Sequence, residues 1–351
     1  MSRLGVAVAA AAVAGAVLVG PVRPAYAGDH DVVATITDDR IPESSALVQS
    51  TIDPQLAYTI NDSGNDNVVY VIDLGSGDVV GTATIDVTAD DTEAMAIGGD
   101  GRLYVADIGD NSVSRRTVAL YAIDQPGRGD TTVTPDVYPV RYSDGPSDAE
   151  TLLVDPATGR MSIVTKNLLA GEVYQLPKHL SQDRVNLARS LNVNTPGMVT
   201  DGAYLPDGSA VLLRTYIDIA VYSIPDWHKL GSIDTPRMPQ SESLAAWNDG
   251  RSVLVGTEKL PSPIIEVKVP RHEWQRLHAG PSRDTSGSAA SPAASAASSS
   301  SEDGDGDGIS SGWVVASGAA LLLLGGGWLW ARRGRRTRGT RRAERQSRST
   351  M

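Results

Sequence analysis

The chain has 351 residues, a formal net charge of −11 and no cysteine. Without cysteine it has no disulfides and no thiolate metal sites, so its stability must come from packing and hydrogen bonds. The acidic balance disfavours binding of DNA or other polyanions through the general surface, and no nucleic-acid partner is expected.

Residues 1–27 have the pattern of a secretory signal peptide. Arg3 gives a short positive start, residues 4–20 are apolar, and Ala25-Tyr26-Ala27 fits a small-x-small cleavage site. An uncleaved membrane anchor is the alternative. A polar break follows the alanine-rich stretch and favours cleavage, so the mature chain is expected to begin near Gly28.

Residues 28–280 contain a motif that recurs five times, at intervals of 41 to 57 residues. Each copy has an acidic residue at the start of a short apolar strand, and a second apolar strand follows. In the last four copies a turn rich in Gly, Asp or Pro joins the two strands. A period of this length is typical of β-propeller blades, each a four-stranded sheet. The acidic residues are Glu43, Glu93, Glu150, Asp201 and Glu242.

Further strands complete the repeats. Four repeats have an apolar-Tyr pair in a third strand, and the fifth repeat ends after Val269 without a fourth strand. An unassigned strand at residues 31–37 precedes the first repeat. The pattern predicts an all-β, five-bladed propeller that this N-terminal strand closes by pairing with the last repeat. Six blades is the alternative, if the connection at residues 117–135 contains further strands.

Polar residues also gather where the second strand of each repeat ends. Antiparallel pairing returns that end to the side of the ring on which the acidic residues lie. We therefore expect one mouth of a central channel to carry both sets. The candidate ligand or metal residues are Glu43, Asp62, Glu93, Asp107, Asp110, Glu150, Asp201, Glu242 and Glu258, beside the basic residues Lys166, Arg214 and Lys259.

Two explanations of this mouth are open. The acids can accept backbone N–H bonds from the neighbouring blade, with the basic residues as counter-ions. Alternatively, the carboxylates hold a divalent cation and the basic residues contact an anionic ligand. The loops at residues 61–66 and 107–111 are compatible with Ca²⁺ or with Asx turns. Calcium is the candidate ion, and no other cofactor is indicated.

Some of these segments resemble a known family. Residues 93–97 with 104–111, and residues 148–153, are similar to bacterial secreted propellers of the phytase-like ("esterase-like activity of phytase") type. The resemblance extends loosely over residues 43–260 and rests on short motifs. It implies a propeller with a mouth compatible with metal and phosphate.

Two functions therefore remain. The first is a binding module for an extracellular protein, a glycan or a small anionic ligand at the mouth. The second is a calcium-dependent phosphoesterase, with Glu93, Glu150, Lys166, Arg214 and Lys259 as candidate catalytic residues. The sequence has neither a G-x-S-x-G elbow nor an H-E-x-x-H motif. This absence favours the binding module and leaves enzymatic activity an open question.

The C-terminal part predicts a membrane anchor. Residues 281–308 are a Ser/Ala/Pro-rich and then acidic linker, whose Asp-Gly run lacks the final Glu of a calcium loop. Residues 309–331 are long and apolar enough to cross a bilayer as a single helix, and residues 332–351 form an arginine-rich tail. The positive-inside rule places this tail in the cytoplasm and the propeller outside the cell, on a single-pass membrane protein.

Overall fold

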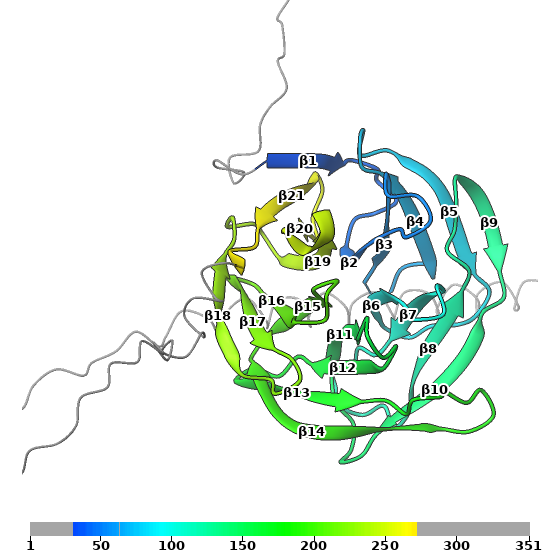
Figure 1. Cartoon of the computed structure of the whole chain (residues 1–351). Coiled ribbons are helices and arrows are strands. Elements are labelled where there is room, and N and C mark those ends of the chain that lie inside the picture. The colour runs from blue at the N-terminus through cyan, green and yellow to red at the C-terminus, as the bar shows by residue number, and fades with distance from the viewer. Residues whose placement is uncertain (1–30, 63, 272–351) are drawn as a thin grey trace, which may run out of the picture. The chain divides into compact units, whose positions relative to one another are not determined.

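The computed structural model describes residues 31–62 and 64–271, and this part of the chain is all-β (Figure 1). The predicted signal peptide, linker, membrane helix and basic tail lie outside the described residues. Within those residues, no helix has the length and apolar character needed to cross a membrane.

The first sheet has five strands. Four are antiparallel in chain order, and β9 is parallel to β5 at the outer edge. The segment that raised the alternative of a sixth blade therefore contributes β8 to the second sheet and β9 to the first. The strands are β2 (Ser44–Gln49), β3 (Leu56–Asn61), β4 (Val68–Asp73), β5 (Val79–Ile85) and β9 (Gly129–Val133).

The second sheet has eight strands in two antiparallel groups of four. The groups join at their outer strands, where residues 140–142 of β10 pair in parallel with residues 186–188 of β14. This junction covers two edges that would otherwise be open to pairing with other chains. The strands are β6 (Thr92–Ile97), β7 (Leu103–Asp107), β8 (Val118–Ile123), β10 (Asp136–Tyr142), β11 (Ala149–Val154), β12 (Met161–Thr165), β13 (Ala170–Gln175) and β14 (Asn186–Pro196).

The last two sheets have four strands each. In one of them, β1 from the N-terminus pairs antiparallel with β21, and Val32 lies opposite Ile265. The predicted pairing of the N-terminal strand with the last repeat is therefore present. The strands are β15 (Val199–Tyr204), β16 (Ala210–Thr215), β17 (Asp218–Ser223) and β18 (Lys229–Asp234) in one sheet, and β19 (Ser241–Trp247), β20 (Ser252–Thr257), β21 (Ser262–Lys268) and β1 (Asp31–Ile36) in the other, with the 3-10 turn η1 (Asn248–Gly250) between β19 and β20.

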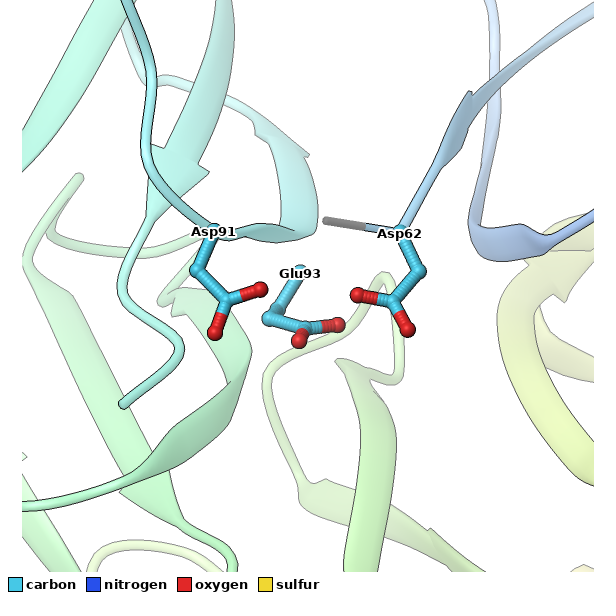
Figure 2. A group of neighbouring side chains, drawn as sticks. All are labelled: Asp62, Asp91 and Glu93. Carbon is cyan, nitrogen blue, oxygen red and sulfur yellow. The ribbon is translucent and has the colours of Figure 1, made fainter. Parts of the chain in front are cut away.

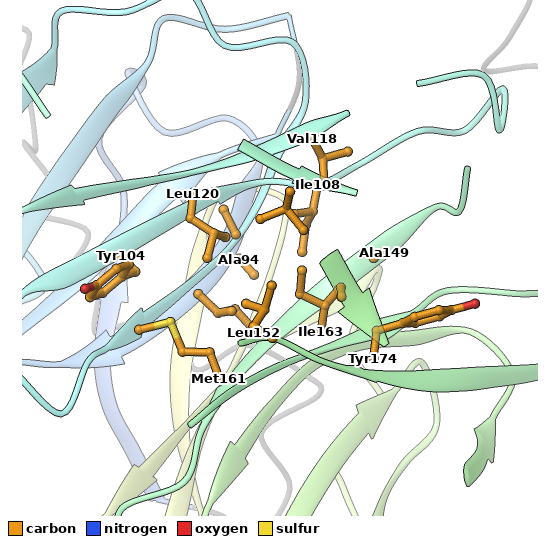
Figure 3. Close-up of a cluster of buried hydrophobic side chains, with 14 of the residues drawn as sticks. Ala94, Tyr104, Ile108, Val118, Leu120, Ala149, Leu152, Met161, Ile163 and Tyr174 are labelled. Atoms are coloured by element: carbon orange, nitrogen blue, oxygen red, sulfur yellow. The ribbon is translucent and has the colours of Figure 1, made fainter. Parts of the chain in front are cut away.

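The first strands of the five repeats lie around one centre (Figure 1). They contact one another in the cyclic order β2, β6, β11, β15, β19 and back to β2. Five clusters of buried apolar side chains fill the spaces between neighbouring four-stranded groups. Figure 3 shows the cluster shared by β6–β8 and β11–β13, with Leu120 and Leu152 in it. Since each group packs on two neighbours, the apolar core is divided among these interfaces.

Ile36 of β1 tests the contribution of the N-terminal strand. Its side chain is 1% exposed and lies in the cluster between the last sheet and the first. We expect Ile36→Ala to lower the free energy of unfolding by about 2–5 kcal/mol, because it removes buried methyl groups and leaves a cavity. Urea unfolding measures this loss. The matched control is Ile52→Ala, since Ile52 is 64% exposed and should change stability by less than about 0.5 kcal/mol. Equal effects of the two substitutions would contradict the assignment of β1 to the core.

Candidate functional site

A β-bulge interrupts the pairing of first and second strands in every repeat. An extra residue at this point turns its side chain away from the regular alternation, and such bulges often re-aim side chains beside functional sites. The bulged residues are Ser45, Glu93, Glu150, Thr200 and the pair Glu242-Ser243. Three of the five acids predicted from the repeat are therefore structurally equivalent.

The other two predicted acids do not occupy the equivalent position. Glu43 precedes the bulge by two residues, and Asp201 follows it by one, so Ser45 and Thr200 take their places. The repeats were aligned in the sequence by their acidic residues. The hydrogen-bond register of the strands instead aligns the repeats by their bulged residues. The expected ring of five acids is corrected to three acids and two hydroxyl residues.

Lys166 is the cation at the centre of this ring. Its ammonium group forms an ion pair with Glu150 and lies 5.4 Å from the ring centroid of Tyr216. Burial acts to lower the pKa of Lys166, but the carboxylates of Glu150 and Glu242 outweigh it and raise this pKa well above its ordinary value. Lys166 therefore keeps its charge although it is largely buried.

Glu242 and Glu258 add two more buried carboxyl groups. Burial raises the pKa of Glu242 to about 7, although Lys166, Arg214 and a hydrogen bond from Tyr216 act to lower it. Burial and the neighbouring Glu242 raise the pKa of Glu258 to about 8. Gln240 donates its side-chain amide to Glu258. We call Glu93, Glu150, Lys166, Tyr216, Glu242 and Glu258 the central cluster.

Asp62, Asp91 and Glu93 bring carboxylate oxygens together beside the central cluster (Figure 2). One oxygen from each lies within 4.8 Å of the others, and Glu93 stands between the two aspartates. Ser45 donates its hydroxyl to Glu93 Oε2 at 3.1 Å. Three converging carboxylates are an oxygen ligand set of the type that Ca²⁺ and Mg²⁺ prefer.

Gly109 and the neighbouring carboxylates shape the surroundings of this trio. A Cβ atom on Gly109 would lie 2.7 Å from Asp91 Cγ and 2.8 Å from Glu93 Cγ, so any other residue there would displace these two side chains. Burial raises the pKa of Glu93 well above its ordinary value, and the carboxylates of Glu150, Asp62 and Asp91 raise it further. A bound cation would relieve this repulsion between carboxylates. Asp91 was missed by the sequence analysis, although its position two residues before Glu93 was a usable signal.

Arg214 is the second buried cation near the centre. It is fully buried on β16, opposite Asp201, and its three guanidinium nitrogens have no hydrogen-bond partner in the described part of the chain. Burial lowers the pKa of Arg214 to about 10, while Glu242, Asp201 and Asp218 act in the opposite direction. Its charge is thus balanced by nearby carboxylates rather than by direct hydrogen bonds.

Three predicted acids serve the fold instead. Asp201 accepts the backbone N–H groups of Gly202 and of Leu244 in the next sheet, each at 2.7 Å. Asp107 accepts the N–H of Asp91 at 2.9 Å and pairs with Arg115 at 2.8 Å. Asp110 behaves in the same way and closes its own loop by accepting the N–H groups of Ser114 and Arg115, each at 2.6 Å. For these residues the architectural explanation holds.

Two further predicted residues lie outside the central cluster. Glu43 is half-buried and accepts the side-chain amide of Asn65 at 2.8 Å. Lys259 is exposed on the β20–β21 connection. Of the three basic residues that the sequence placed at the mouth, Arg214 is fully buried, Lys166 is half-buried and Lys259 is exposed.

No protein-family model matches the sequence, and no curated protein matches it either. Function is therefore inferred from the residues of the site itself.

The raised pKa values of Glu242 and Glu258 predict how stability depends on pH. Both groups hold their protons in the folded state over a range where the unfolded chain, with carboxyl pKa values near 4.5, has lost them. The folded state then binds more protons, so the free energy of unfolding falls as the pH rises from about 4.5 to about 8. Glu258→Gln removes one such group.

We expect Glu258→Gln to raise the melting temperature at pH 9 by about 2–4 °C or more and to change it little at pH 4. Thermal melts over this pH range measure the difference. The control is Glu266→Gln, at a half-buried residue on β21 outside the central cluster. A parallel pH profile for wild type and Glu258→Gln would show that Glu258 titrates normally.

Proposed function

We propose that residues 31–271 form a five-bladed β-propeller, held outside the cell by a C-terminal membrane helix, that acts as a binding module with its ligand at the central cluster. The cyclic contacts of the five first strands and the five shared apolar clusters support five blades. The signal-like N-terminus and the apolar segment at residues 309–331 support the location.

The excess of carboxylates over cations at the centre is the main observation in favour of a ligand site. Glu93, Glu150, Glu242, Glu258 and Arg214 are buried, Lys166 beside them is 15% exposed, and Asp62 and Asp91 adjoin Glu93. Carboxylates thus outnumber cations in a place shielded from water. Asp201 accepts backbone N–H groups, whereas the donors to Glu150 and Glu258 are the side chains of Lys166 and Gln240. Excess buried carboxylate favours a ligand that brings positive charge.

A divalent cation at Asp62, Asp91 and Glu93 is the simplest such ligand. These residues offer oxygen atoms from two adjoining connections and from a bulged strand, and Gly109 leaves them room to converge. The cation would hold the β3–β4 connection against the start of β6.

The second candidate function is the calcium-dependent phosphoesterase, and Lys166 and Arg214 favour it. Lys166 acts electrostatically on Glu93 of the trio, and Arg214 acts on Glu242 of the central cluster, and cations beside carboxylates suit a metal-bound phosphate. In this hypothesis Lys166 and Arg214 stabilise the phosphoryl oxygens, and Glu150 holds Lys166 in place. The resemblance to phytase-like propellers points the same way. The binding module remains the favoured function, because Lys166 is already neutralised by Glu150.

Calcium titration of the full chain tests both candidates. We expect CaCl₂ to raise the melting temperature of the wild type by several degrees, about 2.7 kcal/mol at a hundredfold excess over Kd, and EDTA to reverse it. Asp62→Asn and Glu93→Gln should remove the shift. The control is Asp226→Asn, an equal change of charge at an exposed position away from the trio. Wild type and Asp226→Asn with no calcium or magnesium response would refute the cation site.

Turnover separates the two functions. We expect no calcium-dependent hydrolysis of p-nitrophenyl phosphate by the wild type. Hydrolysis that Glu150→Gln and Lys166→Ala each abolish, with melting profiles unchanged, would establish the phosphoesterase instead.

A further inference from the structure

Exposed aliphatic side chains gather on one side of the central cluster. Of the seven large apolar residues exposed in the described part of the chain, four lie on the connections that leave the second strands of successive repeats. We call them the aliphatic lip: Val113 (55% exposed), Leu168 (76%), Leu169 (89%) and Ile217 (80%). Single exposed apolar residues are ordinary, but a group on equivalent connections indicates an interaction surface.

A chain of contacts ties these connections together. The N–H of Asp110, in the β7–β8 connection, donates to Asp148 Oδ1 at 2.7 Å. The N–H of Lys166, which begins the β12–β13 connection, donates to the backbone oxygen of Asp148 at 2.9 Å. The ammonium of Lys166 lies over Tyr216, next to Ile217 in the β16–β17 connection. The connections that carry the lip are therefore linked to one another through Asp148 and Lys166, and Lys166 belongs to the central cluster.

Val113 carries a second sign of function. Its backbone has φ of 49°, a left-handed conformation in which a β-branched residue is strained. Glycine or asparagine would relieve this strain at an exposed loop position. A valine in this conformation, with its side chain exposed to solvent, is consistent with contact to another molecule.

The remaining connections are acidic. Asp62 and Asp91 are half-buried, and Asp66 and Asp90 are exposed, with Asp90 3.7 Å from Arg115; the exposed bases Arg116 and Lys259 lie on the β7–β8 and β20–β21 connections. The side of the centre formed by the first sheet is thus negative, and the side formed by the next repeats is aliphatic. A complementary partner has positive charge beside apolar groups.

We propose that the aliphatic lip and the adjoining acids dock a polypeptide segment in which lysine or arginine alternates with leucine, isoleucine or valine. The apolar side chains of the segment cover the lip, and its basic groups face Asp62 and Asp91. This inference rests on the proposed ligand site at the central cluster. An anionic membrane fits the same surface poorly because the acids repel it. A glycan gains little from side chains that form no hydrogen bonds.

The test uses the full chain in detergent micelles with excess EDTA, and fluorescein-labelled peptides of alternating leucine and lysine or of alternating leucine and glutamate. Fluorescence anisotropy should report binding of the lysine peptide and none of the glutamate peptide. The double substitution Leu168→Ser with Leu169→Ser, and separately Ile217→Ser, should each weaken binding at least about tenfold. The matched control Ile52→Ser, at an exposed isoleucine on the β2–β3 connection, should leave the affinity unchanged.

Each alternative has its own outcome. If Asp62→Asn weakens binding of the lysine peptide but the lip substitutions leave this binding unchanged, the inference about the lip is wrong and the ligand site is kept. If neither peptide binds while calcium still raises the melting temperature, the polypeptide partner is overturned and the cation site is kept. Lip-dependent self-association in sedimentation, or lip-dependent binding to phosphatidylglycerol vesicles, would replace the proposed partner by a second copy or by a membrane.

Discussion

The pairing of β1 with β21 is the constraint on which the rest of the arrangement depends. It supplies the outer strand of the last sheet from the opposite end of the chain. It also brings Ile36 into the cluster that joins the last sheet to the first. This cluster lies beside the direct contact of β19 with β2, so β1 reinforces the place where the cyclic order of the five first strands closes. Glu242 and Glu258 come from the last repeat, so their approach to Glu93 and Lys166 requires the closed order.

Closure brings several buried carboxylates together at the centre, and Lys166 compensates only part of their negative charge. Bulges turn Glu93, Glu150 and Glu242 out of the regular strand alternation, and Lys166 compensates two of them. Protonation relieves the rest of this charge, because burial raises the pKa values of Glu93 and Glu258 and, despite Lys166, that of Glu242. Such a site favours a ligand that brings positive charge, because the ligand relieves the repulsion between the buried carboxylates. The excess of buried carboxylates favours a binding function over a purely structural one.

Much of the architecture could be predicted from the sequence, because the same strand pattern recurs in each of the five repeats. The four strands of each repeat, the return of the N-terminal strand and the grouping of Glu93, Glu150 and Glu242 all followed from it. The bulge register did not, since one extra residue shifts Glu43 and Asp201 out of equivalence without disturbing the apolar pattern. The parallel contacts of β9 with β5 and of β10 with β14 are long-range, and nothing local encodes them. Tyr216 was overlooked because its role depends on a neighbour fifty residues away.

Closure of the ring is tested most directly by cross-linking β1 to β21. Asp31 and Glu266 are partners in the antiparallel register, and the chain has no cysteine of its own. The double substitution Asp31→Cys with Glu266→Cys should form an intramolecular disulfide under mild oxidation and raise the unfolding midpoint in urea. Asp31→Cys with Asp130→Cys, on a different sheet, should stay reduced. Free thiols in both folded variants would contradict the closed arrangement and the site that depends on it.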